Sequence, residues 1–464
     1  MSRATATDLV YLVAIIGFIF ALIGLSSPKH ARRGNQLGAL GMIIAVAWTF
    51  SLPAVYGSTR NLVLIVIAVV IGTAIGVPAA RLVKMTAMPQ MVAIFNGVGG
   101  GAAALVSVTE FISLGHGSIA VYKICEVLFG VLVGSVSFAG SAVAFAKLQE
   151  LMTGRPITYP AQQPINAAIG LAIVVLIVVT IVTANTAVLI VVLLLSVVLG
   201  GIFVLPIGGA DTPVLISLLN AFTGLAVAAS GFTLNSNLLI VAGTLVGASG
   251  TLLTRLMSEA MGRSLPNILF SAFGSVITAT GGTDTDGRSV RSGTPEDIGV
   301  LLAYSQKVAI IPGYGLAVAQ GQHAARELAE ALEARGVNVF YAIHPVAGRM
   351  PGHMNVLLAE ANVPYEELEE MDQANIDLPT TDVALVVGAN DTVNPAAENT
   401  PGSPIYGMPI VHANDANNVV VMKRSMRPGF AGIDNELLFD PKTTMLFGDA
   451  KDTLVKLVAA VKNA

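Results

Sequence analysis

The chain has 464 residues, of which 54% are hydrophobic and only 12% are charged, whereas an average soluble protein has about 25% charged residues. Residues 1–258 hold 11 Lys and Arg against 5 Asp and Glu, and residues 259–464 hold 14 against 24. This division excludes a single soluble domain and gives no sign of a nucleic-acid-binding protein.

Most of the first 258 residues lie in apolar runs long enough to cross a bilayer, which takes about 20 mainly apolar residues. The first run lacks the basic segment and the cleavage site of a signal peptide, so we expect a retained helix. Cys125, the only cysteine, lies in an apolar run and cannot form an internal disulfide. We predict a membrane domain over residues 1–262 with about nine spans, near residues 9–26, 37–56, 62–82, 89–109, 121–146, 165–184, 186–206, 213–231 and 237–258.

Basic residues collect in alternate loops between these runs. Loops one, three and five and the segment after the last run contain Lys29, Arg32, Arg33, Arg81, Lys84, Lys147, Arg155 and Arg263. The other loops contain little more than Arg60. Because positive loops stay on the cytoplasmic side, we expect a periplasmic N-terminus and a cytoplasmic C-terminal domain.

Polar residues inside or at the ends of spans need a partner or a purpose. For Asn96 and Asn220, hydrogen bonds between helices and a water-filled proton or ion path remain equally open, and neither side chain can titrate. Glu126 lies three residues after Lys123, so the two could simply pair on one helix face. The candidates for a proton path or for coupling are Asn96, Glu126, Ser141, Asp211 and Asn220.

A stretch rich in Gly, Thr, Ser and Asp over residues 275–297 interrupts the apolar pattern. We interpret residues 263–297 as a flexible hinge between the membrane domain and a soluble domain over residues 298–464. Thr294 and Pro295 then have the pattern of an N-cap and first helical residue, for a helix that runs to about Ser305.

The soluble part alternates strand-like and helix-like segments, which predicts an α/β Rossmann-like domain with a six-stranded parallel sheet. A helix is expected over residues 352–363, a closing amphipathic helix over 451–461, and a solvated helix face over the acidic run 366–372. The strands are expected at residues 308–311, 337–346, 383–390, 409–413, 418–424 and 445–450.

The first of these strands leads into a glycine-rich turn and then a helix, the order of a dinucleotide-binding unit. Gly313 would permit the tight turn, and Gly315 would let backbone N–H groups approach a pyrophosphate. Ala317 and Val318 would let the helix pack closely on the strand. Such a short glycine pattern alone is a weak signal.

The nucleotide is indicated by charges elsewhere in the domain. An NAD site has a carboxylate at the end of the second strand, but that strand ends in His344, and Glu333 falls in the preceding helix. Lys423, Arg424 and Ser425 follow the fifth strand directly, and two cations with a hydroxyl suit a 2′-phosphate. A solvated basic loop is the alternative.

Two further loops carry polar side chains. Residues 388–395 follow a strand, and Asp391 there could hydrogen-bond a carboxamide or cap the next helix. Arg349, between glycines and prolines, would suit a phosphate or partner contact. His344 and His353 flank Arg349 without a third ligand and make a poor metal site. The sequence has no Walker A, zinc or Ser-His-Asp signature.

Four segments of the soluble part, which follow about nine spans, carry a resemblance to a known family: PGYGLAVAQ, HPVAGRMPGHMNVLLAEA, VGANDTVNPAA and KRSM. The resemblance covers essentially the whole chain. The chain resembles the β subunit of proton-translocating NAD(P) transhydrogenase. The resemblance implies a proton-conducting membrane domain and a cytoplasmic domain that binds NADP(H). Hydride would pass directly between NADP(H) and an NAD(H) held by a separate α component, and inward proton movement would drive NADP⁺ reduction by NADH.

The resemblance also assigns residues. No catalytic acid or base is needed for direct hydride transfer, and Asp211 and Asn220 match positions linked to coupling. Asn96 stands where some relatives have a proton-handling histidine, and Phe430 stands where some have tyrosine, in a loop over residues 427–432 that folds over the nucleotide. The implied NADP(H)-binding residues are Gly313, Tyr314, Gly315, Val318, Arg349, Gly388, Asn390, Asp391, Lys423, Arg424, Ser425, Gly429 and Phe430.

The implied partners are the bilayer of a bacterial inner membrane and an α component with further transmembrane helices, in a dimer of αβ units. Because the chain has one dinucleotide pattern and hydride exchange needs two, an NADP(H)-gated channel or transporter without redox chemistry is the competing interpretation. An integral reductase would need a flavin, haem or quinone site, which the sequence does not indicate.

Overall fold

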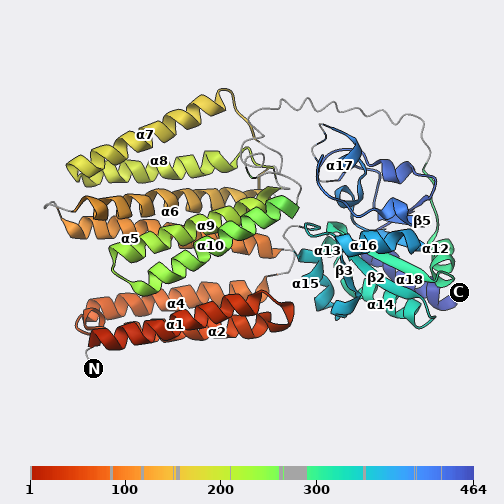
Figure 1. Ribbon diagram of the computed structural model, residues 1–464, viewed down its shortest axis with the longest axis horizontal. Coiled ribbons are helices and arrows are strands. Elements are labelled where there is room, and N and C mark those ends of the chain that lie inside the picture. The colour runs from red at the N-terminus through yellow and green to blue at the C-terminus, as the bar shows by residue number, and fades with distance from the viewer. Residues whose placement is uncertain are drawn as a thin grey trace. The chain divides into compact units, whose positions relative to one another are not determined.

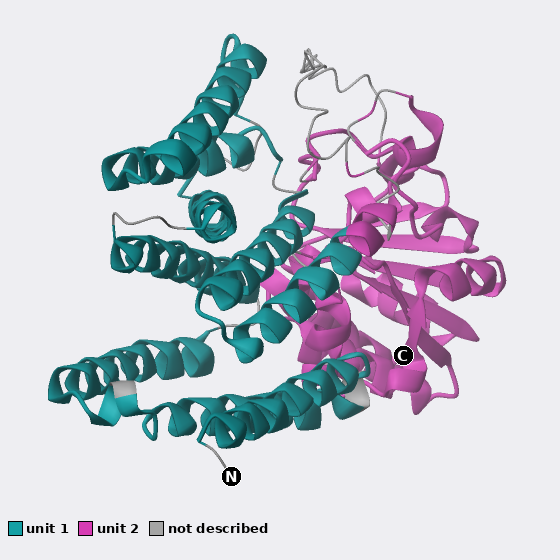
Figure 2. Cartoon of the chain, turned by 60° about the vertical axis from the view of Figure 1, so that its left-hand side comes forward, with its two compact units in different colours: residues 1–254 teal, residues 255–464 magenta. Residues whose placement is uncertain are grey.

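The computed structural model describes residues 3–260, 265 and 290–464, apart from residues 84–86, 116–119, 150, 153–156, 209–210, 349–351, 402, 404 and 430. Several predicted positions fall outside these residues, namely Lys84, Arg155, Arg263, Arg349, Phe430 and most of the hinge. The chain divides into two compact units, residues 1–254 and 255–464, which are coloured separately in Figure 2. Each unit is described by itself.

The first unit is built from long helices (Figure 1). Within the described residues, eight helices are long and apolar enough to cross a membrane. This confirms the predicted polytopic helical domain. The helices are α1 (Arg3–Leu25), α2 (Pro28–Thr49), α3 (Pro53–Tyr56), α4 (Thr59–Leu82), α5 (Met88–Leu114), α6 (Val121–Leu148), α7 (Gln162–Thr183), α8 (Thr186–Val204), α9 (Thr212–Thr233) and α10 (Asn237–Ala260).

Helix α2 is the ninth long helix of the described residues, and it corrects one predicted span. The span expected at 37–56 belongs to a helix that starts at Pro28 and ends at Thr49. Pro28 suits the first helical turn because its missing N–H would have no partner there. The basic segment placed in a loop is therefore helical, and its polar residues keep α2 below the apolarity of the other spans.

Helix α6 packs against α5, α8 and α9, and glycines allow the backbones to touch. A Cβ on Gly134 of α6 would lie 2.6 Å from the carbonyl oxygen of Gly100 on α5. Gly224 of α9 is as tightly placed against Gly247 of α10. The small-residue segments 97–104 and 243–253 therefore pack closely against neighbouring helices. Helix α4, in contrast, buries no residue among those described.

The described residues of the second unit form a six-stranded, wholly parallel sheet with the order β3-β2-β1-β4-β5-β6. This confirms the predicted Rossmann-like class. Ile310 of β1 pairs with Tyr341 of β2 on one side and Leu385 of β4 on the other. The strands are β1 (Lys307–Pro312), β2 (Asn338–Ile343), β3 (Leu368–Glu370), β4 (Val383–Val387), β5 (Asn418–Lys423) and β6 (Thr443–Phe447).

Helices cover the sheet, and the capped helix predicted after Thr294 is present. The Thr294 hydroxyl accepts from the Asp297 N–H at 3.2 Å while the Asp297 carboxylate accepts from the Thr294 N–H at 3.3 Å. A buried core that includes Ile311, Phe340 and Val386 lies on one face of the sheet. The helices are α12 (Pro295–Ala303), α13 (Tyr314–Val318), α14 (Gln322–Glu333), α15 (His353–Glu360), α16 (Met371–Asp377), α17 (Ala396–Asn399) and α18 (Ala450–Asn463).

One predicted strand is absent from the sheet, and one observed strand was not predicted. The predicted strand at 409–413 is wrong, because this segment pairs with no strand, and its backbone bonds loop carbonyls and side chains instead. Asn375 donates to the Ile410 carbonyl and accepts from the His412 N–H, each at 2.9 Å. The missing edge strand is β3, inside the acidic run that was predicted as a solvated helix face. Arg326 of α14 holds this run through Glu367, at 2.7 Å.

Candidate functional site

The glycine turn after β1 lies against the loop after β4, at the point where the strand order reverses. Gly313 donates its N–H to the Val387 carbonyl and Gly315 donates to the Gly388 carbonyl, both at 2.9 Å. A Cβ on Gly313 would lie 2.4 Å from the Ala389 backbone, and one on Gly315 would lie 2.7 Å from the Gly388 Cα. Glycine is therefore required for the two loops to meet, at the position where such sheets bind ligands.

The helix after this turn departs from the prediction. It ends at Val318, and a turn at residues 319–321 separates it from α14. Ala317 packs inside as expected, but the Val318 side chain is 46% exposed, so its predicted packing contact with the strand is wrong. The Tyr314 ring faces the ring of the buried His353 edge-on, with centroids 6.4 Å apart.

The end of β2 carries no carboxylate. His344 follows the strand, and its Nδ1 accepts from the Val346 N–H at 3.2 Å, so the proton lies on Nε2, which donates to the Pro409 carbonyl at 2.8 Å. Burial lowers the pKa of His344, which keeps the ring neutral. Glu333 ends α14, as predicted, and lies 3.9 Å from Arg326. The acidic residue of an NAD site is missing from this strand end.

The cations after β5 lie beside the loop after β4. Lys423 Nζ donates to the Asn390 side-chain oxygen at 2.8 Å and to the Arg427 carbonyl at 2.9 Å. Burial lowers the pKa of Lys423, and the carboxylates of Asp391 and Asp434 offset this only in part. Arg424 and Ser425 are exposed. One oriented cation and two accessible donors thus lie at the carboxyl edge of the sheet.

The segment after these cations folds back onto Asp391. The Asp391 carboxylate accepts from the Ala431 N–H and from the Asn390 side-chain amide, each at 2.9 Å. A Cβ on Gly429 would lie 2.4 Å from the same carboxylate. Asn435, which the sequence did not single out, donates to the Asn390 carbonyl at 3.0 Å. Its position in a polar loop gave no signal.

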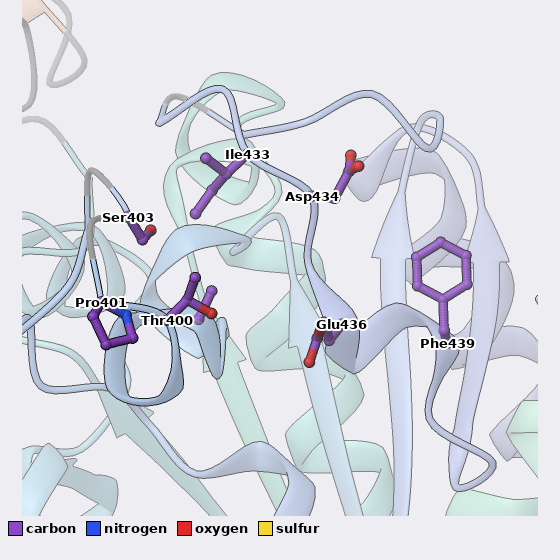
Figure 3. A pocket seen from close by; sticks show the side chains of 8 residues that line it. Thr400, Pro401, Ser403, Ile433, Asp434, Glu436 and Phe439 are labelled. Carbon is purple, nitrogen blue, oxygen red and sulfur yellow. The ribbon is translucent and has the colours of Figure 1, made fainter. Parts of the chain in front are cut away.

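Beside this edge lies a hollow of about 440 Å³ between the segment after α17 and the loop before β6 (Figure 3). Its walls mix apolar side chains with two carboxylates. None of the predicted nucleotide-binding residues lines it, so it is separate from the candidate site. The lining residues are Ala396, Thr400, Pro401, Ser403, Ile433, Asp434, Glu436 and Phe439.

In the membrane unit, Asn96 of α5 joins α6 through hydroxyl groups. Its side-chain amide donates to Ser141 Oγ at 2.9 Å and to Ser137 Oγ at 3.3 Å. Ser137 donates to the Leu219 carbonyl of α9 at 2.8 Å and lies 2.6 Å from the Thr223 hydroxyl. We call Asn96, Ser137, Ser141 and Thr223 the hydroxyl cluster. Ser137 was not predicted, although it lies one helical turn before Ser141 on the same face.

The other candidates lie apart from the hydroxyl cluster. Asn220 makes no hydrogen bond to it among the described residues, and Asp211 is buried just before α9. Glu126 lies fifteen residues before Ser141 on α6, about 22 Å away along the helix. The described residues show no ion pair between Lys123 and Glu126, and one Glu126 oxygen is buried without a hydrogen-bond donor. The structure therefore brings together only Asn96 and Ser141 of the five.

Long apolar helices and a 3-2-1-4-5-6 parallel sheet with a glycine turn at its switch point define a class: polytopic membrane proteins that carry a dinucleotide-type domain. A family model described as NAD(P) transhydrogenase beta subunit matches residues 7–460. The chain is 48% identical over 459 residues to the NAD(P) transhydrogenase subunit beta of Rhodospirillum rubrum, with 97% of this chain and 98% of that protein covered. The same values hold for the subunit from its strain ATCC 11170.

The chain belongs to the NAD(P) transhydrogenase beta subunit family. It is thus one subunit of a transhydrogenase complex that also needs an α partner, and a channel without redox chemistry is not favoured.

Proposed function

We propose that the carboxyl edge of β1, β4 and β5 binds NADP(H), with Lys423, Arg424 and Ser425 at the 2′-phosphate. The observation that carries this proposal is the combination of cations after β5 with the lack of a carboxylate after β2. The 2′-phosphate of NADP(H) forms strong hydrogen bonds with cations, whereas the 2′-hydroxyl of NAD(H) donates to an acceptor such as a carboxylate.

The remaining predicted residues then have supporting roles. Gly313, Tyr314 and Gly315 with Gly388 form the floor of the site, and Asn390 orients Lys423. Asp391 holds the segment 427–432 in place through Ala431. Arg349 and Phe430 stay proposed contacts from the resemblance alone. The bound nucleotide supplies or accepts the hydride, and the chain contributes binding and orientation.

Lys423→Met tests the phosphate site on the full-length chain. We expect NADPH affinity to fall by about 100-fold, since a charged hydrogen bond to phosphate is lost, and NADH affinity to change little. Lys442→Met is the matched control, because Lys442 bonds two backbone carbonyls near the other end of β5. Equal losses for both nucleotides, measured by isothermal titration, would remove the case for a 2′-phosphate site.

We also propose that the membrane unit conducts protons inward and that this drives hydride transfer from NADH on the α partner to NADP⁺. The hydroxyl cluster supports this, because the buried side-chain oxygen Oδ1 of Asn96 has no donor among the described residues and could accept one from water. Asn96 does not titrate, so it would order water while another group carries the proton. Asp211 and Asn220 are the proposed coupling residues and Glu126 a further path residue.

Asn220→Leu tests the coupling assignment in vesicles that contain the αβ complex. We expect NADH-driven NADP⁺ reduction and its proton uptake to fall together. Wild-type values for both would show that Asn220 is not on the path.

The proposed setting is a bacterial inner membrane, with a periplasmic N-terminus, a cytoplasmic nucleotide domain and a dimer of αβ units. The alternation of basic residues between successive span ends of the sequence supports the orientation. Protease treatment of sealed right-side-out vesicles checks it, and cleavage within residues 290–464 there would reverse it.

A further inference from the structure

The feature of interest is Lys147, in the last turn of α6. Lys147 was predicted to lie in a basic loop, but its side chain is only 4% exposed. Its ammonium group donates to three backbone carbonyls where α8 ends and the next segment begins. The acceptors are Leu205 at 2.5 Å, Ile207 at 2.7 Å and Val204 at 3.3 Å.

These contacts match what a buried ammonium needs. An ammonium group has three donors and no acceptor, and three carbonyl oxygens lie within hydrogen-bond distance of Lys147 Nζ. The carbonyls at a helix C-terminus lack intrahelical partners and carry the negative end of the helix dipole. No carboxylate pairs with Lys147 among the residues that the structure describes, so these carbonyls provide its compensation. The Val204 and Leu205 carbonyls also accept from the Ile207 and Ile157 N–H groups, at 3.2 and 3.0 Å. A neutral side chain at position 147 would therefore remove the described donor of the Ile207 carbonyl.

The contacts fix the segment that leads to Asp211. Residues 205–208 follow α8, and the Asp211 N–H donates to the Gly208 carbonyl at 3.1 Å. Ile207 is 2% exposed and Asp211 is 8% exposed. Asp211 directly precedes the first residue of α9. At the same end of the bundle, Gln90 of α5 donates to the carbonyl of Leu148, the residue after Lys147. The ends of α5, α6 and α8 are therefore tied together where α9 begins.

We infer that Lys147 is a positioning residue that holds residues 205–208 and thereby, through the hydrogen bond from Asp211 to Gly208, the Asp211 carboxyl and the start of α9. The inference rests on the proposed coupling role of Asp211. Among the described residues, Lys147 makes no hydrogen bond to the hydroxyl cluster. Its loss therefore affects how a proton gradient stimulates the reaction, and it leaves the KM for NADP⁺ unchanged.

The holding role is tested by cysteine labelling of the αβ complex in detergent. Ile207→Cys is introduced together with Cys125→Ser, and its reaction with a polar maleimide reports opening of the segment. Adding Lys147→Met is expected to speed labelling by about ten-fold, since hydrogen bonds from a charged group are lost. Lys147→Arg keeps the charge and is expected to label slowly. Ser196→Ala removes a buried hydroxyl of α8 that bonds only within its helix, and it serves as the control.

If Lys147→Met does not assemble, Lys147→Gln replaces it. The inference is overturned if the variant that assembles is labelled no faster than the protein with Ile207→Cys and Cys125→Ser alone. In vesicles, the ratio of NADP⁺ reduction with and without an imposed proton gradient should fall toward one in Lys147→Met and recover in Lys147→Arg. Asp211→Asn separates the two claims: a wild-type ratio there refutes the coupling role of Asp211, while labelling still decides the role of Lys147.

Discussion

At the residue scale, the contact between Gly429 and Asp391 decides where the segment after β5 can lie. Because an added Cβ would fall 2.4 Å from the Asp391 carboxylate and 2.6 Å from the Asn390 amide, Gly429→Ala must displace the segment. We expect a cost of about 1–3 kcal/mol in local packing and NADPH affinity reduced by about ten-fold. Fluorescence titration measures it, with Gly170→Ala, where a Cβ meets open space, as the control. Unchanged affinity would place the segment elsewhere when nucleotide binds.

His344 gives the soluble unit a predicted acid sensitivity. Burial lowers the pKa of His344 below its ordinary 6.5, so in mildly acidic solution the unfolded chain binds a proton that the folded chain does not. Stability that is present above pH 6.5 is therefore lost as the pH falls through this value, by at most about 1.4 kcal/mol per pH unit. His344→Gln should flatten the dependence of Tm on pH between 7.5 and 5.5. His323→Gln, at an exposed position, should not, and an unflattened His344→Gln curve would contradict the assignment.

At the element scale, apolar pattern predicted five of the six strands and failed where the strand is short and charged. β3 has three residues, two of them glutamates, and it exists because Tyr341 and its neighbours in β2 offer a partner and Arg326 neutralises the adjacent Glu367. Both causes are distant in sequence. The apolar residues Ile410 and Val411 led to the prediction of a strand where there is none, because a buried loop can have the same apolar composition as a buried strand.

The same arginine supports a stability prediction. Arg326 pairs with Glu330, Glu333 and Glu367 through a side chain that is only 16% exposed. Arg326→Met therefore leaves the Glu367 carboxylate, which is 20% exposed, without its cation beside the edge strand. We expect about 3 kcal/mol of lost stability by chemical denaturation of the full-length chain. Lys462→Met breaks the ion pair between Lys462 and Glu327, which is of similar length but has side chains that are both more than half exposed. This change should cost under about 1 kcal/mol of stability. Similar losses for both would mean that burial of the Arg326 pairs adds nothing.

At the scale of the whole molecule, the two units differed in how much of their sites the sequence revealed. The soluble site follows from strand ends, because parallel strands bring their carboxyl ends to one edge. In the membrane unit, Asn96 and Ser141 stood out as polar residues, but Ser137 and Thr223 did not, since hydroxyls are common in helices and often bond their own backbone. Only the packing of α5, α6 and α9 shows which hydroxyls meet.

If proton binding and nucleotide binding are coupled in this protein, each must change the affinity for the other by the same factor. If proton binding at a group reached through the hydroxyl cluster changes the relative affinities for NADPH and NADP⁺, then the bound nucleotide must change the proton affinity of that group by the same factor, commonly about 5–150-fold. Asn96→Leu removes the amide that joins α5 to α6, so a proton gradient should no longer shift the NADPH-to-NADP⁺ affinity ratio in vesicles. Thr180→Val, at a buried hydroxyl of α7 that bonds only within its helix, should keep the shift. A full shift in Asn96→Leu would show that the coupling does not pass through the hydrogen bonds of Asn96 to Ser137 and Ser141, which that variant lacks.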